Sequence, residues 1–388
     1  MREFLARRLG GLVQSDIRRM TRECDRVGGI NLGQGLGDLP PPEAVVAGAK
    51  RALDERPHSY TYPEGIPELR EAIAAKLARD NGIDADPRDE IVVTVGSSGA
   101  FTCALHALLD PGDGLLLLEP YYGYHLNTAI VAGIEPRFAT LEPPDFALTA
   151  DRLRAALRPN TRAIVVCTPS NPSGKMFDRA EIEAVADVAR ERDLLVITDE
   201  IYEYIRYDGR DHVSPATVAD LRERTVTIMG LSKTFSITGW RLGYAVAPPA
   251  MARAIALVHD LFYICAPAPL QYGALAGFAA PPEALCDLAA TYQRKRDRLC
   301  AALADAGMRP IVPQGAYYVL ARIDHFGYET ARACAMDLLE RGGVAAVPGS
   351  AFYRGREGDG LLRFCFAKRD DELDEACRRL RRFAPRPR

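Results

Sequence analysis

The chain has 388 residues, with 49 Lys and Arg against 52 Asp and Glu, a formal net charge of −3 and 48% hydrophobic residues. This composition is that of an ordinary globular protein, and the length exceeds the size at which one core stops growing, so we expect two domains. The near-neutral charge lacks the basic excess of proteins that bind nucleic acid, and it argues against an anionic membrane as a partner.

The N-terminal string and the cysteines narrow the class of protein further. The string MREFLARRLGGL has no continuous apolar core, so we expect no secretory signal. The most apolar short run, Leu115 to Leu118, is too short to span a bilayer. Nine cysteines without a C-x-x-C pair predict reduced thiols in the cytoplasm, and six histidines without metal-ligand spacing predict no metal site.

The middle of the chain alternates short apolar runs with helical patterns. In chain order, we expect buried strands over 91–95, 163–167, 194–198 and 226–229. Helices are expected after Ser97-Ser98-Gly99 and after the capping box of Asp178 and Glu181. Because these apolar runs do not alternate with polar residues, they predict strands buried on both faces and hence a mostly parallel sheet between helices. Polar residues follow each run, at the edge where such sheets bind ligands.

The last third of the chain has a different pattern. We expect a long helix over 292–306, a strand over 316–320, a helix near 331–339, a strand near 362–366 and a last helix that includes Leu373 and Leu380. This order predicts a smaller α+β domain. The arginine-rich tail from Arg378 to Arg388 is expected to be the solvated face of that last helix and a frayed end.

Lys233 follows the fourth expected strand, in the string L-S-K-T-F-S-I-T-G-W-R-L-G-Y. Beside a buried strand end, desolvation lowers the pKa of a lysine and frees its amine as a nucleophile. The alternative is a lysine that extends along the surface with its charge in water. Asp199, which ends another buried strand, needs a cationic partner if it is buried.

Three strings in this order, S-N-P-S-G-K, T-D-E-I-Y and S-K-T-F-S-I-T-G-W-R-L-G, resemble the fold-type-I pyridoxal-phosphate enzymes, specifically the class I/II aminotransferases. The resemblance covers nearly the whole chain, from I-N-L-G-Q-G-L-G-D-L-P-P-P-E-A to L-R-F-C-F-A-K, and is close to the aspartate and kynurenine/glutamine transaminases. It implies an α/β fold whose large domain, over 42–280, holds a mostly parallel seven-stranded sheet. The smaller α+β domain is expected from both chain ends, 1–41 and 281–388.

The resemblance implies roles for three catalytic residues. Lys233 would form the internal Schiff base with pyridoxal 5'-phosphate and move the substrate Cα proton. Asp199 would pair with the pyridine nitrogen, which lets the ring accept electrons. Tyr202, together with Asn171, would hydrogen-bond the phenolic oxygen of the cofactor; a core tyrosine is the alternative for Tyr202. A helix N-cap is the alternative for Asp199.

The remaining site residues follow from the same resemblance, apart from one physical argument. The amides of Ser97, Ser98 and Gly99, at a helix N-terminus, form an anion site for the phosphate. Family members commonly have Ser where this chain has Gly230, and Ser232 or Ser97 is expected to replace that hydroxyl. The other implied cofactor contacts are Arg241 to the phosphate, Tyr122 and Ile201 on the ring faces, and Tyr60 from a neighbouring subunit.

The substrate contacts implied by the resemblance are Arg363, as the clamp of the α-carboxylate, Gly35, through its backbone, and Asn171. A surface arginine and a turn glycine are the alternatives for the first two. If Tyr60 crosses between subunits, the protein is a homodimer with shared active sites.

The predicted function is transfer of an amino group from an L-amino acid to a 2-oxoacid by a ping-pong mechanism. The same fold hosts other chemistry, so a β-lyase or a specialised biosynthetic pyridoxal-phosphate enzyme is the alternative. A cofactor-bound transcription regulator is disfavoured because no basic recognition helix is visible.

Overall fold

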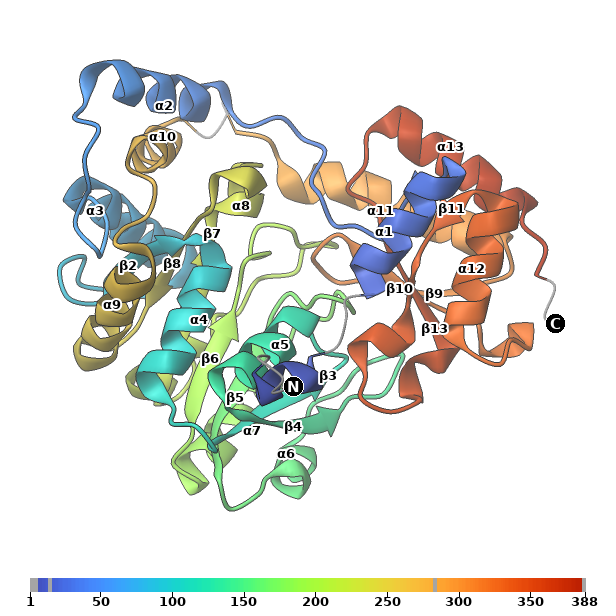
Figure 1. Ribbon diagram of the computed structural model, residues 1–388, viewed down its shortest axis with the longest axis horizontal. Coiled ribbons are helices and arrows are strands. Elements are labelled where there is room, and N and C mark those ends of the chain that lie inside the picture. Colours follow the sequence, from blue (N-terminus) through green and yellow to red (C-terminus); the bar gives the residue numbers. More distant parts are fainter. Residues whose placement is uncertain (1–5, 13–15, 282–284, 386–388) are drawn as a thin grey trace, which may run out of the picture.

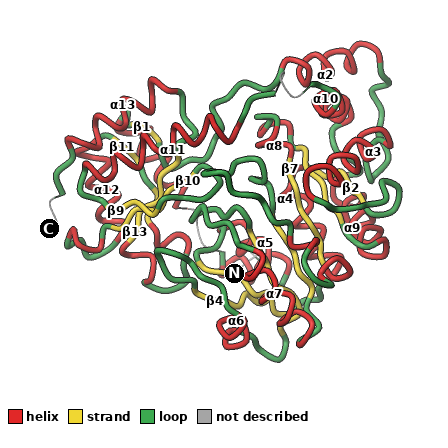
Figure 2. The backbone as a smooth tube through the Cα atoms, turned by 180° about the vertical axis from the view of Figure 1, so that it is seen from behind, coloured by secondary structure: helices red, strands yellow, loops and turns green. Residues whose placement is uncertain are grey.

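The computed structural model describes residues 6–12, 16–281 and 285–385. Figure 1 shows two parts side by side. In the part on the right, the blue helix α1 (Asp16–Val27) lies among the orange and red elements of the last third of the chain, whereas the dark blue η1 (Arg7–Gly11) lies beside α5 (Gly123–Ala132) of the other part. The middle of the chain forms the other part. Figure 2 shows the strands of both parts from behind.

A seven-stranded sheet is the centre of the larger part. Its strand order is β2-β8-β7-β6-β5-β3-β4; β8 is antiparallel to both its neighbours and the other pairs are parallel. The predicted mostly parallel seven-stranded sheet is therefore confirmed. The strands are β2 (Ile91–Val95), β3 (Gly114–Glu119), β4 (Glu135–Thr140), β5 (Thr161–Cys167), β6 (Leu195–Asp199), β7 (Thr225–Gly230) and β8 (Leu242–Val246).

Helices cover this sheet on both faces, with the apolar sides of the helices packed on the buried strands (Figure 1). The helices are α2 (Glu43–Glu55), α3 (Pro67–Lys76), η2 (Leu77–Asn81), α4 (Gly96–Leu108), α5 (Gly123–Ala132), α6 (Ala150–Ala156), α7 (Arg179–Glu191), α8 (Leu231–Thr234), α9 (Pro249–Tyr263) and α10 (Ala268–Phe278). The predicted capping box begins α7: the amide of Glu181 donates to Asp178 Oδ1 at 2.9 Å, and the amide of Asp178 donates to Glu181 Oε2 at 3.0 Å.

The smaller part is built on a four-stranded antiparallel sheet, β12-β13-β10-β9, and a two-stranded parallel sheet, β1-β11. Its elements are α1 (Asp16–Val27), β1 (Ile30–Asn31), α11 (Leu288–Asp305), β9 (Arg309–Ile311), β10 (Tyr318–Arg322), α12 (Ala331–Gly342), β11 (Val344–Ala345), β12 (Val347–Pro348), β13 (Leu361–Cys365) and α13 (Asp370–Arg382). Ile30 pairs with Val344, so the first strand is held by a strand more than 300 residues later.

One hydrophobic core joins the two ends of the chain, because Met20 and Leu32 pack in the same cluster as Leu299 and Leu380. The strand expected over 316–320 begins only at Tyr318, since Ala316 has a left-handed backbone with φ 57°. The short helices are η1 (Arg7–Gly11), η3 (Pro215–Thr217), η4 (Leu221–Arg224), η5 (Thr238–Trp240), η7 (Asp324–Phe326), η8 (Gly349–Phe352) and η9 (Glu357–Gly360). In the described ranges, no helix is long and apolar enough to cross a membrane.

Candidate functional site

A cavity of about 340 Å³ lies at the carboxyl ends of β5, β6 and β7, where the two parts of the molecule face each other. This is the edge at which parallel sheets bind ligands. Of the residues predicted for the site, those that line the cavity are Gly35, Ser97, Ser98, Tyr122, Asn171, Asp199, Ile201, Tyr202, Ser232, Lys233, Arg241 and Arg363. Gly99 and Tyr60 lie outside it.

Lys233 stands in the single turn of α8, directly after the buried strand β7. Its Nζ lies 5.5 Å from the centre of the Tyr317 ring. The pKa of Lys233 is lowered from its ordinary value to about 8. Desolvation by burial is the main cause and the charge of Arg241 adds to it, whereas Cys365 and Asp199 act in the opposite direction. The unprotonated fraction of this amine at neutral pH is therefore much larger than that of a lysine with the ordinary pKa, as a nucleophile requires.

Asp199 ends β6, and its partner is a residue that the sequence analysis missed. Oδ2 accepts a hydrogen bond of 2.9 Å from Nε2 of the buried His125, while Oδ1 accepts a longer one, of 3.4 Å, from the amide of Ile201. His125 lies in the first turn of α5, three residues after Tyr122, in the string Y-Y-G-Y-H. A histidine one helical turn beyond a predicted ring-stacking residue was the signal that could have identified it.

Tyr202 and Asn171 both line the cavity. The Tyr202 hydroxyl donates a hydrogen bond of 3.3 Å to the hydroxyl of Tyr318. Tyr318 is the second site residue that sequence reasoning missed. Burial holds the pKa of Tyr202 well above its usual value, so this hydroxyl stays protonated and remains a donor. Asn171 is buried in the loop after β5, where its Oδ1 accepts a hydrogen bond from Arg363.

Arg363, on β13, is only 1% exposed and is held without a carboxylate partner among the described residues. Nη1 donates to Asn171 Oδ1 at 2.9 Å and Nη2 donates to the carbonyl of Gly33, while the rings of Tyr318 and Phe352 lie 4.3 and 4.8 Å from the guanidinium carbon. Its Nε has no hydrogen-bond partner in the part of the chain that the structure describes. A buried cation without a counterion is costly, so the site is suited to an incoming carboxylate.

Gly35 lies against the same tyrosine. A Cβ at this position would stand 1.8 Å from the Tyr318 hydroxyl oxygen, so only glycine allows the backbone this close to the cavity. Its carbonyl accepts a hydrogen bond of 3.2 Å from the Tyr317 hydroxyl. The alternative of a simple turn glycine does not account for this close approach.

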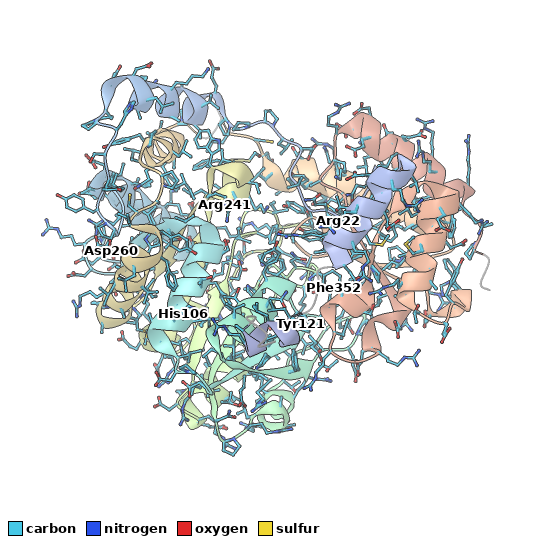
Figure 3. The ribbon with its side chains drawn as sticks, in the orientation of Figure 1. Arg22, His106, Tyr121, Arg241, Asp260 and Phe352 are labelled. Atoms are coloured by element: carbon cyan, nitrogen blue, oxygen red, sulfur yellow. The ribbon has the colours of Figure 1, made fainter. Side chains whose placement is uncertain are left out.

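The first turn of α4 and Arg241 form a second positively polarised region. The N–H groups of Ser97 and Ser98 belong to this first turn, where helices bind anions. Arg241 Nη2 donates to Ser98 Oγ at 2.9 Å, and Nη1 donates to the carbonyl of Thr238 at 3.1 Å. Gly99 is one position further along this turn and faces Val95 and Tyr263 instead of the cavity. Figure 3 shows Arg241 beside α8.

The space around Gly230 gives a physical reason for the absence of the serine that the family resemblance led us to expect here. A Cβ on Gly230 would lie 2.7 Å from both Cγ1 and Cδ1 of Ile201. Ile201 thus occupies the space that a serine would need. Ser97 and Ser232 both line the cavity and are the hydroxyls available in its place.

The family model for class I and II aminotransferases matches residues 27–380. The probable N-succinyldiaminopimelate aminotransferase of Mycobacterium tuberculosis is 35% identical over 95% of this chain and 96% of its own length. The aromatic-amino-acid aminotransferase 2 of Thermococcus litoralis is 34% identical, with 97% of both chains covered.

Solved structures give the same result. The structure of N-succinyldiaminopimelate aminotransferase from Mycobacterium tuberculosis superposes with a TM-score of 0.93, at 34% identity, over 97% of this chain and 99% of the other. The matched segment contains every cavity residue predicted for the cofactor and the substrate. The chain therefore belongs to the class I and II aminotransferases, pyridoxal-phosphate-dependent enzymes that transfer an amino group from an amino acid to a 2-oxoacid.

Proposed function

We propose that Lys233, Asp199 and Tyr202 are the catalytic residues of this transamination. One observation carries the proposal: a single cavity holds the amine of Lys233, whose pKa is lowered, between two anion-binding regions. Arg363 forms one region and the first turn of α4 with Arg241 forms the other, and neither arginine pairs with a carboxylate among the residues that the structure describes. An amino acid supplies a carboxylate for one region and the cofactor supplies a phosphate for the other.

The donor set fits pyridoxal phosphate. Arg241, Ser232 and the amides of Ser97 and Ser98 would hold the phosphate, with Gly99 completing the helix turn behind them. Asp199 would accept a hydrogen bond from the protonated pyridine nitrogen. When bound, the cofactor supplies an electron sink for the bond that breaks at the substrate Cα.

The remaining roles follow from hydrogen-bonding capacity and shape. The Tyr202 hydroxyl and the Asn171 amide would donate to the phenolic oxygen of the cofactor, while Tyr122 and Ile201 cover the two faces of its ring. His125, through its hydrogen bond to Asp199, orients that carboxylate and adds no reacting atom of its own.

On the substrate side, Arg363 would bind the α-carboxylate with its two terminal nitrogens, next to the Asn171 amide and the Gly35 backbone. This orientation directs the substrate Cα toward Lys233. Lys233 Nζ would take the proton from the substrate Cα and later give it up again, and the lowered pKa of this amine suits it to both roles.

A homodimer with shared sites is the assembly that we propose. The end of α9 exposes Leu261 at 76%, with Leu257, Phe262 and Ile264 beside it, and this apolar surface continues toward Gly99 through Tyr263. Large exposed apolar patches mark interfaces between proteins. Tyr60 is 74% exposed in one subunit, and we assign it to the phosphate of the partner's cofactor.

We propose the domain division at 42–280 against 1–41 and 281–388. The strand pairing supports it, since β1 pairs with β11 and the central sheet uses only β2 to β8, although η1 contacts α5 of the larger part. Nine free cysteines fit a reducing compartment, and we place the enzyme in the cytoplasm.

The test uses purified holoenzyme and one amino acid at a time without an acceptor. Transamination predicts one equivalent of 2-oxoacid per active site and conversion of the cofactor to its amine form. Borohydride reduction followed by mass spectrometry should find the cofactor on Lys233 in the wild type and on no residue in Lys233→Ala. Release of pyruvate and ammonia over many turnovers without an acceptor would indicate a β-lyase instead.

A further inference from the structure

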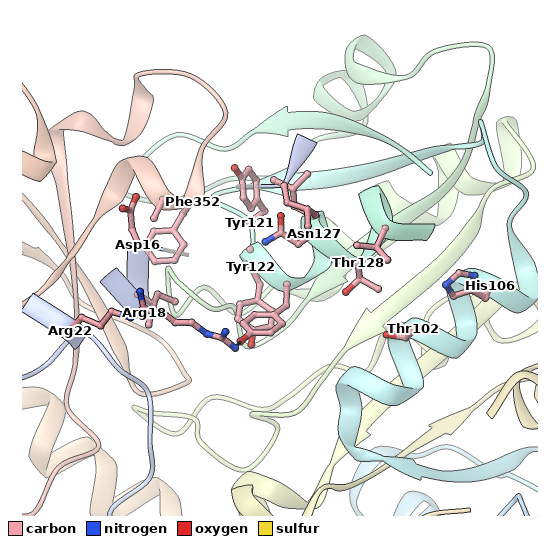
Figure 4. A pocket seen from close by; sticks show the side chains of 17 residues that line it. Asp16, Arg18, Arg22, Thr102, His106, Tyr121, Tyr122, Asn127, Thr128 and Phe352 are labelled. Atoms are coloured by element: carbon pink, nitrogen blue, oxygen red, sulfur yellow. Dashed lines mark hydrogen bonds between the residues drawn. The ribbon is translucent and has the colours of Figure 1, made fainter. Parts of the chain in front are cut away.

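A second cavity, of about 590 Å³, adjoins the active-site cavity (Figure 4). Four residues line both cavities, and these are Ile17, Tyr122, Tyr124 and Thr128. The roles proposed above leave this second space unused. A substrate clamped by Arg363 can therefore extend its side chain past Tyr122 and into a volume large enough for a small ligand.

Most of the wall is apolar or aromatic, with Leu126, Val131 and Phe352 among its members. The charged part of the wall comes from α1. Arg18 and Arg22 both line the cavity, and Figure 4 shows the side chain of Arg18 directed toward Tyr122. The cavity thus combines an apolar body with a basic side.

The two arginines are four positions apart, so they lie on the same face of α1, where like charges repel each other. Arg18 Nη2 donates to a neutral group, the Tyr124 hydroxyl, at 3.2 Å. Within the described ranges, neither Arg18 nor Arg22 pairs with a carboxylate. The one carboxylate of the wall, Asp16, is already paired with Arg332 at 2.8 Å.

We propose that the physiological substrate is a long-chain 2-amino acid, or its 2-oxoacid, whose side chain ends in a carboxylate that Arg18 and Arg22 bind. The proposal rests on the transamination site described above, because Arg363 must hold the other end of the molecule. Arg18 stands at the junction between the cavities and Arg22 about one helical turn, ~6 Å, further along α1. The preference for a terminal carboxylate should therefore increase for side chains longer than that of glutamate.

The kinetic experiment compares substrates of equal length with and without the terminal charge. For the holoenzyme we expect kcat/KM for 2-aminopimelate and 2-aminosuberate to exceed kcat/KM for amino acids of equal length without the terminal carboxylate. The expected ratio is about tenfold, because each of the two partly exposed ion pairs contributes a factor of about three. Arg18→Gln and Arg22→Gln should each reduce this ratio, and the double variant should bring it close to one. Salt should weaken the preference, because exposed charges are screened.

Arg26→Gln is the matched control, since Arg26 is on the same helix, is paired with Glu23 at 2.8 Å and lies outside the cavity. It should keep the wild-type ratio. A double variant with the wild-type ratio, or a wild type without a preference, would overturn the proposal while leaving transamination intact.

A binding measurement tests the carboxylate subsite separately from the transamination assignment. Calorimetry on the holoenzyme should find tighter binding of suberate than of octanoate, and the double variant should lose the difference. If no amino acid is transaminated but this difference is present, the transamination assignment fails and the carboxylate subsite stands. If suberate and octanoate bind equally, the subsite is wrong.

Discussion

At the scale of single residues, the pKa of Lys233 is a property of its surroundings. Burial at the end of β7 disfavours the ammonium form and lowers the pKa from 10.5 to about 8. The amine loses its proton as pH rises, so the rate at which apoenzyme captures pyridoxal phosphate should rise with pH and level off above about 8. Stopped-flow absorbance across pH 6.5 to 10.5 checks this. A rate that still climbs tenfold per pH unit at pH 9.5 would contradict the lowered pKa.

His125 is expected to act as a positioning residue through Asp199. Loss of its 2.9 Å hydrogen bond to a carboxylate in His125→Ala should reduce kcat by about tenfold or more, because bonds to charged groups are worth ~1.5–3 kcal/mol. KM for the amino acid should change little. The absorbance maximum of the bound cofactor should shift, which a purely structural defect would not produce. His125→Asn, which retains a donor, should recover part of kcat, and the exposed His58→Ala is the control.

How far single residues could be predicted depended on sequence context. Lys233, Asp199 and Arg363 are in strings that identify the family, and all three line the cavity. His125 and Tyr318 are in no such string, and their contacts arise only when α5 and β10 pack beside the sheet edge. Tertiary packing of this kind leaves no periodic signal along the chain.

At the scale of elements, the long buried strands and the capped helix α7 were predictable because their signals are local. The antiparallel direction of β8 was not, since pairing with β2 and β7 depends on contacts distant in sequence. The two-residue strands β1, β11 and β12 are too short to show alternation. Ser97 and Ser98 were expected between the strand and the helix, but they are already in α4 because the helix begins at Gly96. The backbone of Gly96 is in the left-handed region, which glycine adopts readily.

The capping box of α7 gives a prediction at this scale. In Asp178→Ala the amide of Glu181 loses its acceptor, so the free energy of unfolding should fall by about 1 kcal/mol. α7 lies away from the cavity and contributes no residue to its wall, so kcat/KM should be unchanged. Denaturant unfolding followed by circular dichroism measures the effect, with Asp187→Ala, at an exposed position within the same helix, as the control. Equal stability of Asp178→Ala and wild type would contradict the role of the cap.

At the scale of the whole molecule, the two chain ends and the middle of the chain complete one site. Gly35 and Arg363 come from the smaller part, and Lys233 and Asp199 from the larger. The weak net charge is compatible with anion binding because the positive charges are local, at Arg241, Arg363 and the start of α4. The hydrogen bond from Arg18 on α1 to Tyr124 on α5 could not be derived from the sequence, because it depends on how the two parts of the molecule are assembled.

The shared site of the proposed homodimer can be tested by mixing two inactive variants. Lys233→Ala lacks the amine, and Tyr60→Ala lacks the exposed hydroxyl that we assign to the partner's phosphate. In a mixed dimer, the site with Lys233 receives Tyr60 from the Lys233→Ala subunit, so it is complete, while the other site carries both defects. Dissociating and reassociating an equal mixture should therefore restore about a quarter of the wild-type activity, since half of the dimers are mixed and each has one intact site. If Tyr60 acts within its own subunit, or the protein is a monomer, mixing restores nothing, and light scattering distinguishes these two cases.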